Sequence, residues 1–146
     1  MSTASATTVP STAAMGTTVL RGILGGLAGG LVFGVLMQMM GMIPMVAMMV
    51  GSQSAAVGWL VHLAISAFIG ATFGLFVGAR VRTFRTGLAL GISYGIVWWV
   101  IGALVAMPAR LGMPIFEINS TSLQSLMGHM IFGALLGAVV AAFGRR

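Results

Sequence analysis

The chain has 146 residues, of which 59% are hydrophobic and only 5% are charged, and its formal net charge is +6. A soluble domain is about a quarter charged, so this composition excludes a soluble domain, and the seven arginines are spread along the chain, which argues against a nucleic-acid-binding face. There is no cysteine and Glu117 is the single acidic residue, which excludes disulfides, thiolate catalysis and paired carboxylates and leads us to expect a protein that is not an enzyme.

Four apolar stretches follow an N-terminal segment rich in Ser, Thr and Ala. Residues 1–18 have the composition of a flexible tail, and they lack the basic start of a signal peptide. Each apolar stretch is close to the ~20 residues that cross a hydrocarbon core, and none alternates polar and apolar residues as a strand would. The sequence therefore predicts an all-α, four-helix transmembrane domain over residues 19–146, with spans at about 20–43, 57–79, 87–107 and 123–143.

The arginines are unevenly distributed among the connections between the spans. Arg21 precedes the first span, and three arginines lie between the second and third spans: Arg80, Arg82 and Arg85. Arg145 and Arg146 follow the fourth span, whereas Arg110 alone lies between the third and fourth. Positive residues favour the cytoplasmic side of a membrane. We therefore expect a multi-pass protein of the cell (inner) membrane with both termini in the cytoplasm.

The two halves of the chain resemble each other. GILGGLAGG at 22–30 aligns with GLALGISYG at 87–95, and the only two histidines, His62 and His129, align at a spacing of 67. Two helices per unit give two parallel repeats, related by a pseudo-twofold axis along the membrane normal. The repeat predicts that both histidines lie at one depth, roughly 8–10 Å below the outer interface.

Small residues recur every four positions on all four predicted helices. Residues at this spacing share one side of a helix, and small side chains allow two helices in lipid to approach closely. We predict helix packing at Gly22, Gly26, Gly30, Gly34, Gly70, Gly74, Gly78, Gly87, Gly91, Gly95, Gly133 and Gly137. The rows end in larger residues on the outer side, which predicts space there and a polar cluster of His62, His129, Gln38, Ser66, Ser125 and Trp99.

The histidine pair has more than one interpretation. Each ring could simply form a hydrogen bond within the bundle, without a cofactor. The pair could instead bind copper or the iron of a haem, because imidazole and soft thioethers suit copper(I), although methionine is also common core filler. The candidate metal ligands are His62, His129, Met37, Met40 and Met130. A quinone or pigment against nearby aromatic rings is a variant, and a small outward-opening transporter or channel is a further alternative.

Three short motifs carry a resemblance to a family. GMIPM at 41–45, GWLVH at 58–62 and GHMIFG at 128–133 together resemble small four-helix membrane proteins of bacteria and archaea that are uncharacterised. The likeness covers about residues 20–143 and implies the four-helix fold and no activity. Members often carry an acid after Pro-Met, where Val46 stands here, so a site that used this acid is altered in this chain.

The expectation from the whole sequence is a non-enzymatic integral membrane protein. It stands alone or serves as an accessory subunit of a membrane complex. Its partner is the lipid bilayer, and a small-residue face that is left over could form a homodimer.

Overall fold

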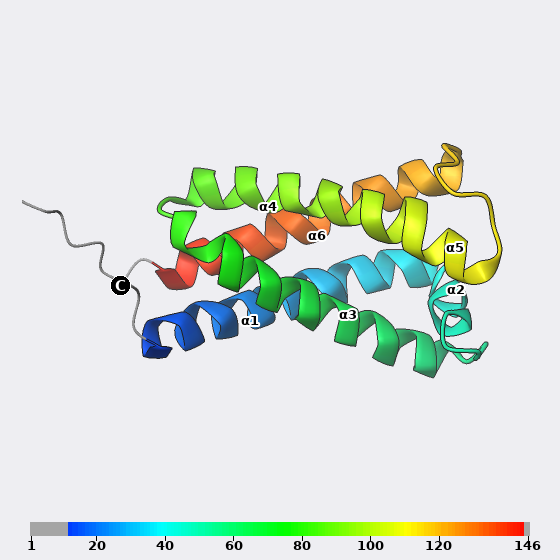
Figure 1. Ribbon diagram of the computed structural model, residues 1–146, viewed down its shortest axis with the longest axis horizontal. Helices are drawn as coiled ribbons and strands as arrows, with labels where there is room; N and C mark the ends of the chain where they lie inside the picture. Colours follow the sequence, from blue (N-terminus) through cyan, green and yellow to red (C-terminus); the bar gives the residue numbers. More distant parts are fainter. Residues whose placement is uncertain (1–11, 145–146) are drawn as a thin grey trace, which may run out of the picture.

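The computed structural model describes residues 12–144, which form helices and short connections and contain no strand (Figure 1). In chain order the elements are α1 (Thr12–Met39), α2 (Ile43–Met48), α3 (Ala55–Phe76), the 3-10 turn η1 (Gly78–Arg80), α4 (Phe84–Trp98), the π-helix η2 (Trp99–Ala106), α5 (Met107–Leu111) and α6 (Ser120–Gly144).

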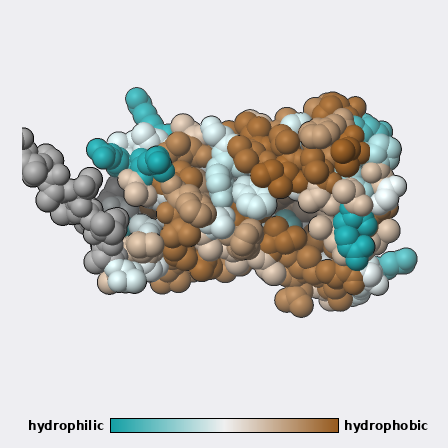
Figure 2. Space-filling model, viewed as in Figure 1, coloured by the Kyte–Doolittle hydropathy of each residue, from teal (hydrophilic) through white to brown (hydrophobic). Residues whose placement is uncertain are grey.

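Four helical segments are long and apolar enough to cross a membrane. They are Thr12–Met39, Ala55–Phe76, Phe84–Leu111 and Ser120–Gly144, and the third combines α4, η2 and α5. Large hydrophobic side chains cover much of the surface along the bundle, and hydrophilic residues gather near its ends (Figure 2). These segments agree with the four spans predicted from hydropathy.

Three boundaries differ from the sequence prediction by four residues or more, and one of them is the end of α1 at Met39, where the predicted span reached residue 43. Helix α1 begins at Thr12, inside the stretch predicted to be a flexible tail, whose residues 1–11 lie outside the described part of the chain. The third segment continues to Leu111, past the predicted end at residue 107. Ala13, Ala14 and Met15 are good helix formers, and Pro108 lies in the first turn of α5, where proline is tolerated.

The helices lie in the spatial order α3, α1, α6, α4 (Figure 1). Helix α1 packs along both α3 and α6, and α4 packs along α6. The end of the bundle that carries η1, Thr12 and Gly144 is called the arginine end below, because three arginines lie in and after η1. The opposite end, which carries α2 and α5, is called the pocket end.

Glycines bring α1 against α3 and α4 against α6 almost backbone to backbone. A Cβ on Gly22 would overlap the carbonyl oxygen of Gly70, and a Cβ on Gly91 would overlap that of Gly133. The other predicted positions are also crowded by backbone, except that Gly30 faces the Ser66 side chain, Gly34 faces the Trp59 ring, and Gly78 is open. At Gly78 a Cβ would be 3.5 Å from the Thr18 Cβ, which is ordinary contact.

A second row of small residues on α1 packs against α6. A Cβ on Gly25 would lie 2.9 Å from the carbonyl oxygen of Leu136, and a Cβ on Gly29 would lie 2.6 Å from that of Phe132. One turn further, the ring of Phe33 fills the space that Gly128 of α6 leaves open. The doubled glycines of GGLAGG therefore serve two neighbours, α3 on one side and α6 on the other.

Helix α4 meets α3 through large side chains. The Tyr94 hydroxyl is 2.7 Å from the Thr72 hydroxyl, and the Tyr94 ring packs edge-on against Phe73 at 5.1 Å between centroids. Trp98 packs in the same way against Phe68, at 6.0 Å. These rings separate the two helices, and beyond Trp98 the gap between them becomes a cavity.

Candidate ligand-binding pocket

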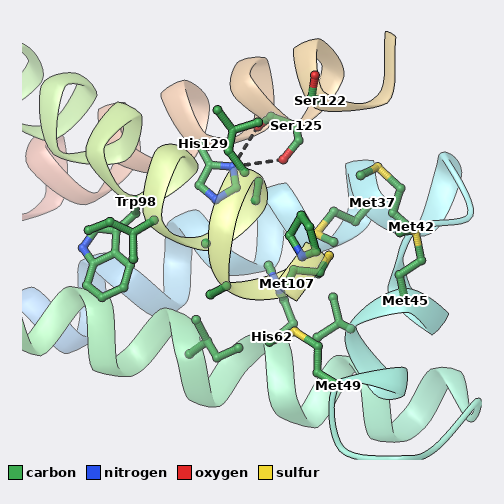
Figure 3. Close-up of a pocket in the computed structure, with 18 of the residues that line it drawn as sticks. Met37, Met42, Met45, Met49, His62, Trp98, Met107, Ser122, Ser125 and His129 are labelled. Atoms are coloured by element: carbon green, nitrogen blue, oxygen red, sulfur yellow. Dashed lines mark hydrogen bonds between the residues drawn. The ribbon is translucent and has the colours of Figure 1, made fainter. Parts of the chain in front are cut away.

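A pocket of about 510 Å³ lies between the two halves of the chain at the pocket end. Its walls come from α1, α2, α3, the end of α4, η2, α5, α6 and the loop before α6 (Figure 3). They are mainly apolar and include Phe33, Ile65, Phe68, Trp98, Ile101 and Phe132. Figure 3 shows Trp98 on the opposite side of the view from the methionines of α2.

The π-helix η2 forms one wall, and Pro108 explains where it ends. Proline has no N–H, so Pro108 cannot donate to the carbonyl oxygen of Leu104, four residues earlier, and its ring crowds that oxygen. The Met107 N–H donates five residues back, to Gly102. The Leu104 oxygen instead accepts from the Phe116 N–H at 2.9 Å, which ties the loop before α6 to η2. Such π segments are frequent at functional sites.

His62 is buried on α3 and faces α1. Its Nε2 lies 2.9 Å from the carbonyl oxygen of Gly30, and its ring packs edge-on against Phe33 at 5.6 Å between centroids. A carbonyl oxygen only accepts, so Nε2 carries the proton and donates it. In the neutral ring, Nδ1 is then the acceptor.

His129 on α6 has the opposite tautomer. Its Nδ1 lies 2.8 Å from the carbonyl oxygen of Ser125, one turn earlier, so Nδ1–H donates there and Nε2 is the acceptor in the neutral ring. The Ser125 hydroxyl lies 3.3 Å from the same Nδ1. The His129 ring also packs against Phe33, at 4.8 Å, so one phenylalanine contacts both histidines.

The acceptor nitrogens of both histidines are accessible. Neither Nδ1 of His62 nor Nε2 of His129 has a hydrogen-bond partner among the described residues. In the same part of the chain, no buried side-chain nitrogen or oxygen lacks a partner. Both atoms must therefore be open to a small probe, and both residues line the pocket. The pocket is thus lined by two histidines, from two different helices, each of which has one ring nitrogen with a free lone pair.

The structure brings together only part of the predicted polar cluster. Ser66 and Ser125 line the pocket beside the histidines, and the Ser66 hydroxyl donates to the His62 carbonyl oxygen at 2.7 Å. Gln38 and Trp99 are not among the lining residues. The Gln38 Oε1 accepts from the Trp59 indole N–H at 3.1 Å, and the Trp99 indole N–H donates to the Ser122 carbonyl oxygen at 2.9 Å.

The predicted methionine ligands are also separated. Met37 lines the pocket, whereas Met40 packs against the core outside it. Met130 lies on the outer side of α6, in a shallow apolar groove with Ile92 and Leu126. Besides Met37, the methionines that border the pocket are not among the predicted ligands, and they are Met42, Met45, Met49, Met107 and Met113. Spacings of three and four place the first three on one helical face, which is a usable signal.

Metal ligands other than methionine are few. Among residues 12–144 there is no group of three histidine, cysteine or acidic side chains that could hold an ion. Glu117, the single acid, lines the pocket and is exposed. A metal bound here would therefore need thioether ligands beside the two imidazoles.

Comparisons of this chain with protein-family models, with curated proteins and with solved structures found no match.

Proposed function

We propose that this chain is a non-enzymatic, multi-pass membrane protein that binds a small lipid-soluble molecule through His62 and His129. The observation that carries the proposal is the pair of free ring nitrogens in one pocket. A histidine with a purely structural role needs only the bond that each ring already makes to a backbone carbonyl. The second nitrogen of each ring is left for a ligand, and intramembrane ionisable residues are often functional.

The size of the pocket favours an organic molecule over a bare ion. A volume of about 510 Å³ falls in the range of roughly 300–1,000 Å³ that small-molecule sites occupy. A metal ion bound at about 2 Å from its ligands would leave most of this space empty.

The pocket opens sideways between α3 and η2. Ile65 and Phe68 of α3 and Ile101 of η2 all line the pocket and are exposed. The surface is hollowed between these two elements (Figure 2). In a membrane this opening faces lipid, so the ligand enters from the bilayer.

The proposal includes two parallel two-helix repeats. What supports the repeat is the shared register of the glycine contacts. A Cβ on Gly22 would meet the Gly70 carbonyl oxygen, and a Cβ on Gly87 would meet that of Gly137, the aligned pair. With both termini in the cytoplasm of a cell-membrane protein, as the arginines predict, the pocket lies in the outer half.

Protein partners, and the alternative role as a transporter or channel, remain predictions from the sequence. An accessory role in a larger complex, or a homodimer, is compatible with the many exposed apolar side chains. A transporter or channel would need a path through the arginine end, where α1 and α3 contact each other backbone to backbone.

Copper or haem is a second candidate ligand, and one observation favours it. Each histidine donates its other ring N–H to a backbone carbonyl, which is how metal-ligating histidines are commonly oriented. Thioethers of Met37, Met42 and Met45 lie around the same pocket, and thioether with imidazole suits copper(I).

The test begins with the protein as isolated from its own membranes in a mild detergent. We expect native mass spectrometry to show a bound component at one copy per chain, lost in His62→Ala and in His129→Ala. Met130→Leu is the matched control, because Met130 neighbours His129 but lies outside the pocket. An absorption spectrum and a metal analysis identify haem or copper.

A pocket-filling variant separates binding from folding. A Cβ on Gly102 meets no heavy atom within 4 Å, and Gly102 lines the pocket. Gly102→Leu should therefore fold and lose the bound component, while Gly102→Ala keeps it. The proposal is wrong if the protein carries nothing, takes up neither copper(I) nor haem nor a lipid-soluble aromatic probe, and is equally stable in all these variants.

A further inference from the structure

We infer that the ligand of this pocket is a small apolar molecule with two hydroxyl groups, of the hydroquinone class, which donates one hydrogen bond to each histidine. The inference rests on the proposed function and specifies the chemistry of its ligand. It follows from which ring nitrogens are free, from how far apart they are and from which other polar groups the pocket offers.

The free nitrogens are both acceptors. The proton of His62 is on Nε2, where it is donated to Gly30, and the proton of His129 is on Nδ1, where it is donated to Ser125. A carbonyl oxygen of a ligand would place its own lone pair against the lone pair of His62 Nδ1 or His129 Nε2, and two acceptors repel each other. A hydroxyl group would supply the missing proton, so the two sites select donors.

Two serine hydroxyls near the histidines already donate to backbone carbonyls, whereas the Ser125 hydroxyl lies 3.3 Å from His129 Nδ1, whose own proton goes to the Ser125 carbonyl oxygen. The Ser66 hydroxyl donates to the His62 carbonyl oxygen at 2.7 Å, and the Ser122 hydroxyl donates to that of Asn119 at 2.9 Å. Figure 3 shows the Trp98 nitrogen on the side of the indole away from His129. The acceptor nitrogens of the two histidines are therefore the groups that require a donor from the ligand, which a diol supplies, while the Ser125 hydroxyl can donate or accept.

The shared contact with Phe33 sets an upper limit on the separation of the two histidines. Both imidazoles contact Phe33, at 5.6 and 4.8 Å between centroids, so their separation cannot exceed these two distances taken together. A benzene ring with hydroxyl groups at opposite positions can reach two acceptors within this limit, because each O–H is bent away from the axis that joins the two oxygens. The remaining wall is apolar and aromatic, with Phe132 and Phe68 available to pack against the ring.

The experiment uses the histidines themselves as reporters. The whole protein is labelled with ¹⁵N at histidine, placed in lipid nanodiscs and titrated without oxygen. The three probes are tetramethylhydroquinone, its dimethyl ether and tetramethylbenzoquinone. They share one methylated ring, but only the first donates hydrogen bonds. Because the chain has two histidines, the unprotonated ring nitrogens give two resonances, assigned with His62→Gln and His129→Gln.

We expect the hydroquinone to move both resonances upfield and to saturate them at a concentration at least about tenfold lower than the ether or the quinone. The shift should disappear in Gly102→Leu and remain in Gly102→Ala. Equal shifts from all three probes, no shift from any, or a shift that persists in Gly102→Leu would each overturn the inference.

Two further results separate this inference from the proposed function. If the hydroquinone has no effect but Gly102→Leu still removes a component from the isolated protein, the diol is wrong and the pocket function stands. If copper(I) stabilised in acetonitrile shifts both resonances where the hydroquinone does not, the diol is wrong and the metal candidate is supported. If nothing binds in either experiment, both proposals fail.

Discussion

The contact between α1 and α6 and the contact between α4 and α3 are built from opposite kinds of residue. On α1, Gly25 and Gly29 let the backbone of α6 approach to contact. In the alignment of 22–30 with 87–95, the same places on α4 hold Leu90 and Tyr94. The first contact is closed along its length, whereas the second is separated by aromatic rings and widens into the pocket.

The difference shows that the pocket depends on side-chain size at a few positions. Small residues bring helices in lipid together because backbone packing then replaces contact with lipid. Where a tyrosine replaces a glycine, the helices must separate by the thickness of a ring. Tyr94 and Trp98 hold α3 and α4 apart, and the cavity lies beyond them. The cavity therefore depends on these large side chains of α4 and not on the histidines.

The largest effect on stability is expected when Gly29 of α1 is replaced by tyrosine, the residue at the aligned position of α4, Tyr94. In Gly29→Tyr, even the Cβ would lie 2.6 Å from the Phe132 carbonyl oxygen, so α1 and α6 must separate. We expect a loss of about 3 kcal/mol or more in unfolding free energy, because overpacking forces backbone shifts. Unfolding in mixed detergent micelles measures it.

Gly16→Tyr is the control for this variant, since a Cβ on Gly16 meets no heavy atom within 4 Å. It should change the unfolding free energy by less than about 0.5 kcal/mol. Equal stability of the two tyrosine variants would show that the second glycine row does not hold α1 against α6.

A smaller effect is expected when the rings between α4 and α3 are removed. Tyr94 is half-buried, so Tyr94→Ala should cost about 2 kcal/mol, below the ~3–5 of a fully buried aromatic residue. Tyr94→Phe loses only the bond to Thr72 and should cost about 0.6 kcal/mol, as for other hydrogen bonds between membrane helices.

Tyr94→Ala also tests whether the Tyr94 ring holds α3 and α4 apart. Spin labels on cysteines introduced at Leu75 and Ala89, in a chain without its own cysteine, report the distance between α3 and α4. In Tyr94→Ala the distance should shorten, while in Tyr94→Phe it should stay the same. An unchanged distance in the alanine variant would contradict the role of Tyr94 as a spacer.

The smallest effect on stability is expected at Pro108. In Pro108→Ala the new N–H can donate to the Leu104 oxygen and compete with the Phe116 N–H, so one bond replaces another and unfolding changes by less than about 1 kcal/mol. Hydrogen exchange of the Phe116 amide should become faster. Pro44→Ala is the control, because Pro44 lies in the first turn of α2, where no N–H is needed, and the Phe116 amide should not respond to it.

The sequence predicted the features that depend on local spacing. Hydropathy located the four spans, and steps of four placed Gly91 and Gly133 at helix contacts, because lipid and close packing each act through one simple property. It did not predict which neighbour each glycine of GGLAGG would face. This depends on the order of helices around α1, which spacing does not encode.

The site shows the same division between local and tertiary information. His62 and His129 were recognised as a pair, because an ionisable residue in an apolar helix stands out in the sequence. The sequence favours Trp99 over Trp98 for the polar cluster, because Trp99 continues the row of Gly95. Trp99 does face α6, where its indole N–H donates to the Ser122 carbonyl oxygen. The pocket lies on the other side of α4, so its tryptophan is Trp98.

Under the proposed function, the opening between α3 and η2 decides which ligand concentration sets the occupancy of the pocket. A site that opens into lipid equilibrates with the bilayer, so its occupancy follows the mole fraction of the ligand among lipids and not its concentration in water. Partition into the membrane then raises the local supply of an apolar compound, and acyl chains at Ile65 and Ile101 become its competitors. Affinities measured in detergent and in bilayers of different composition should therefore differ systematically, even when the protein is unchanged.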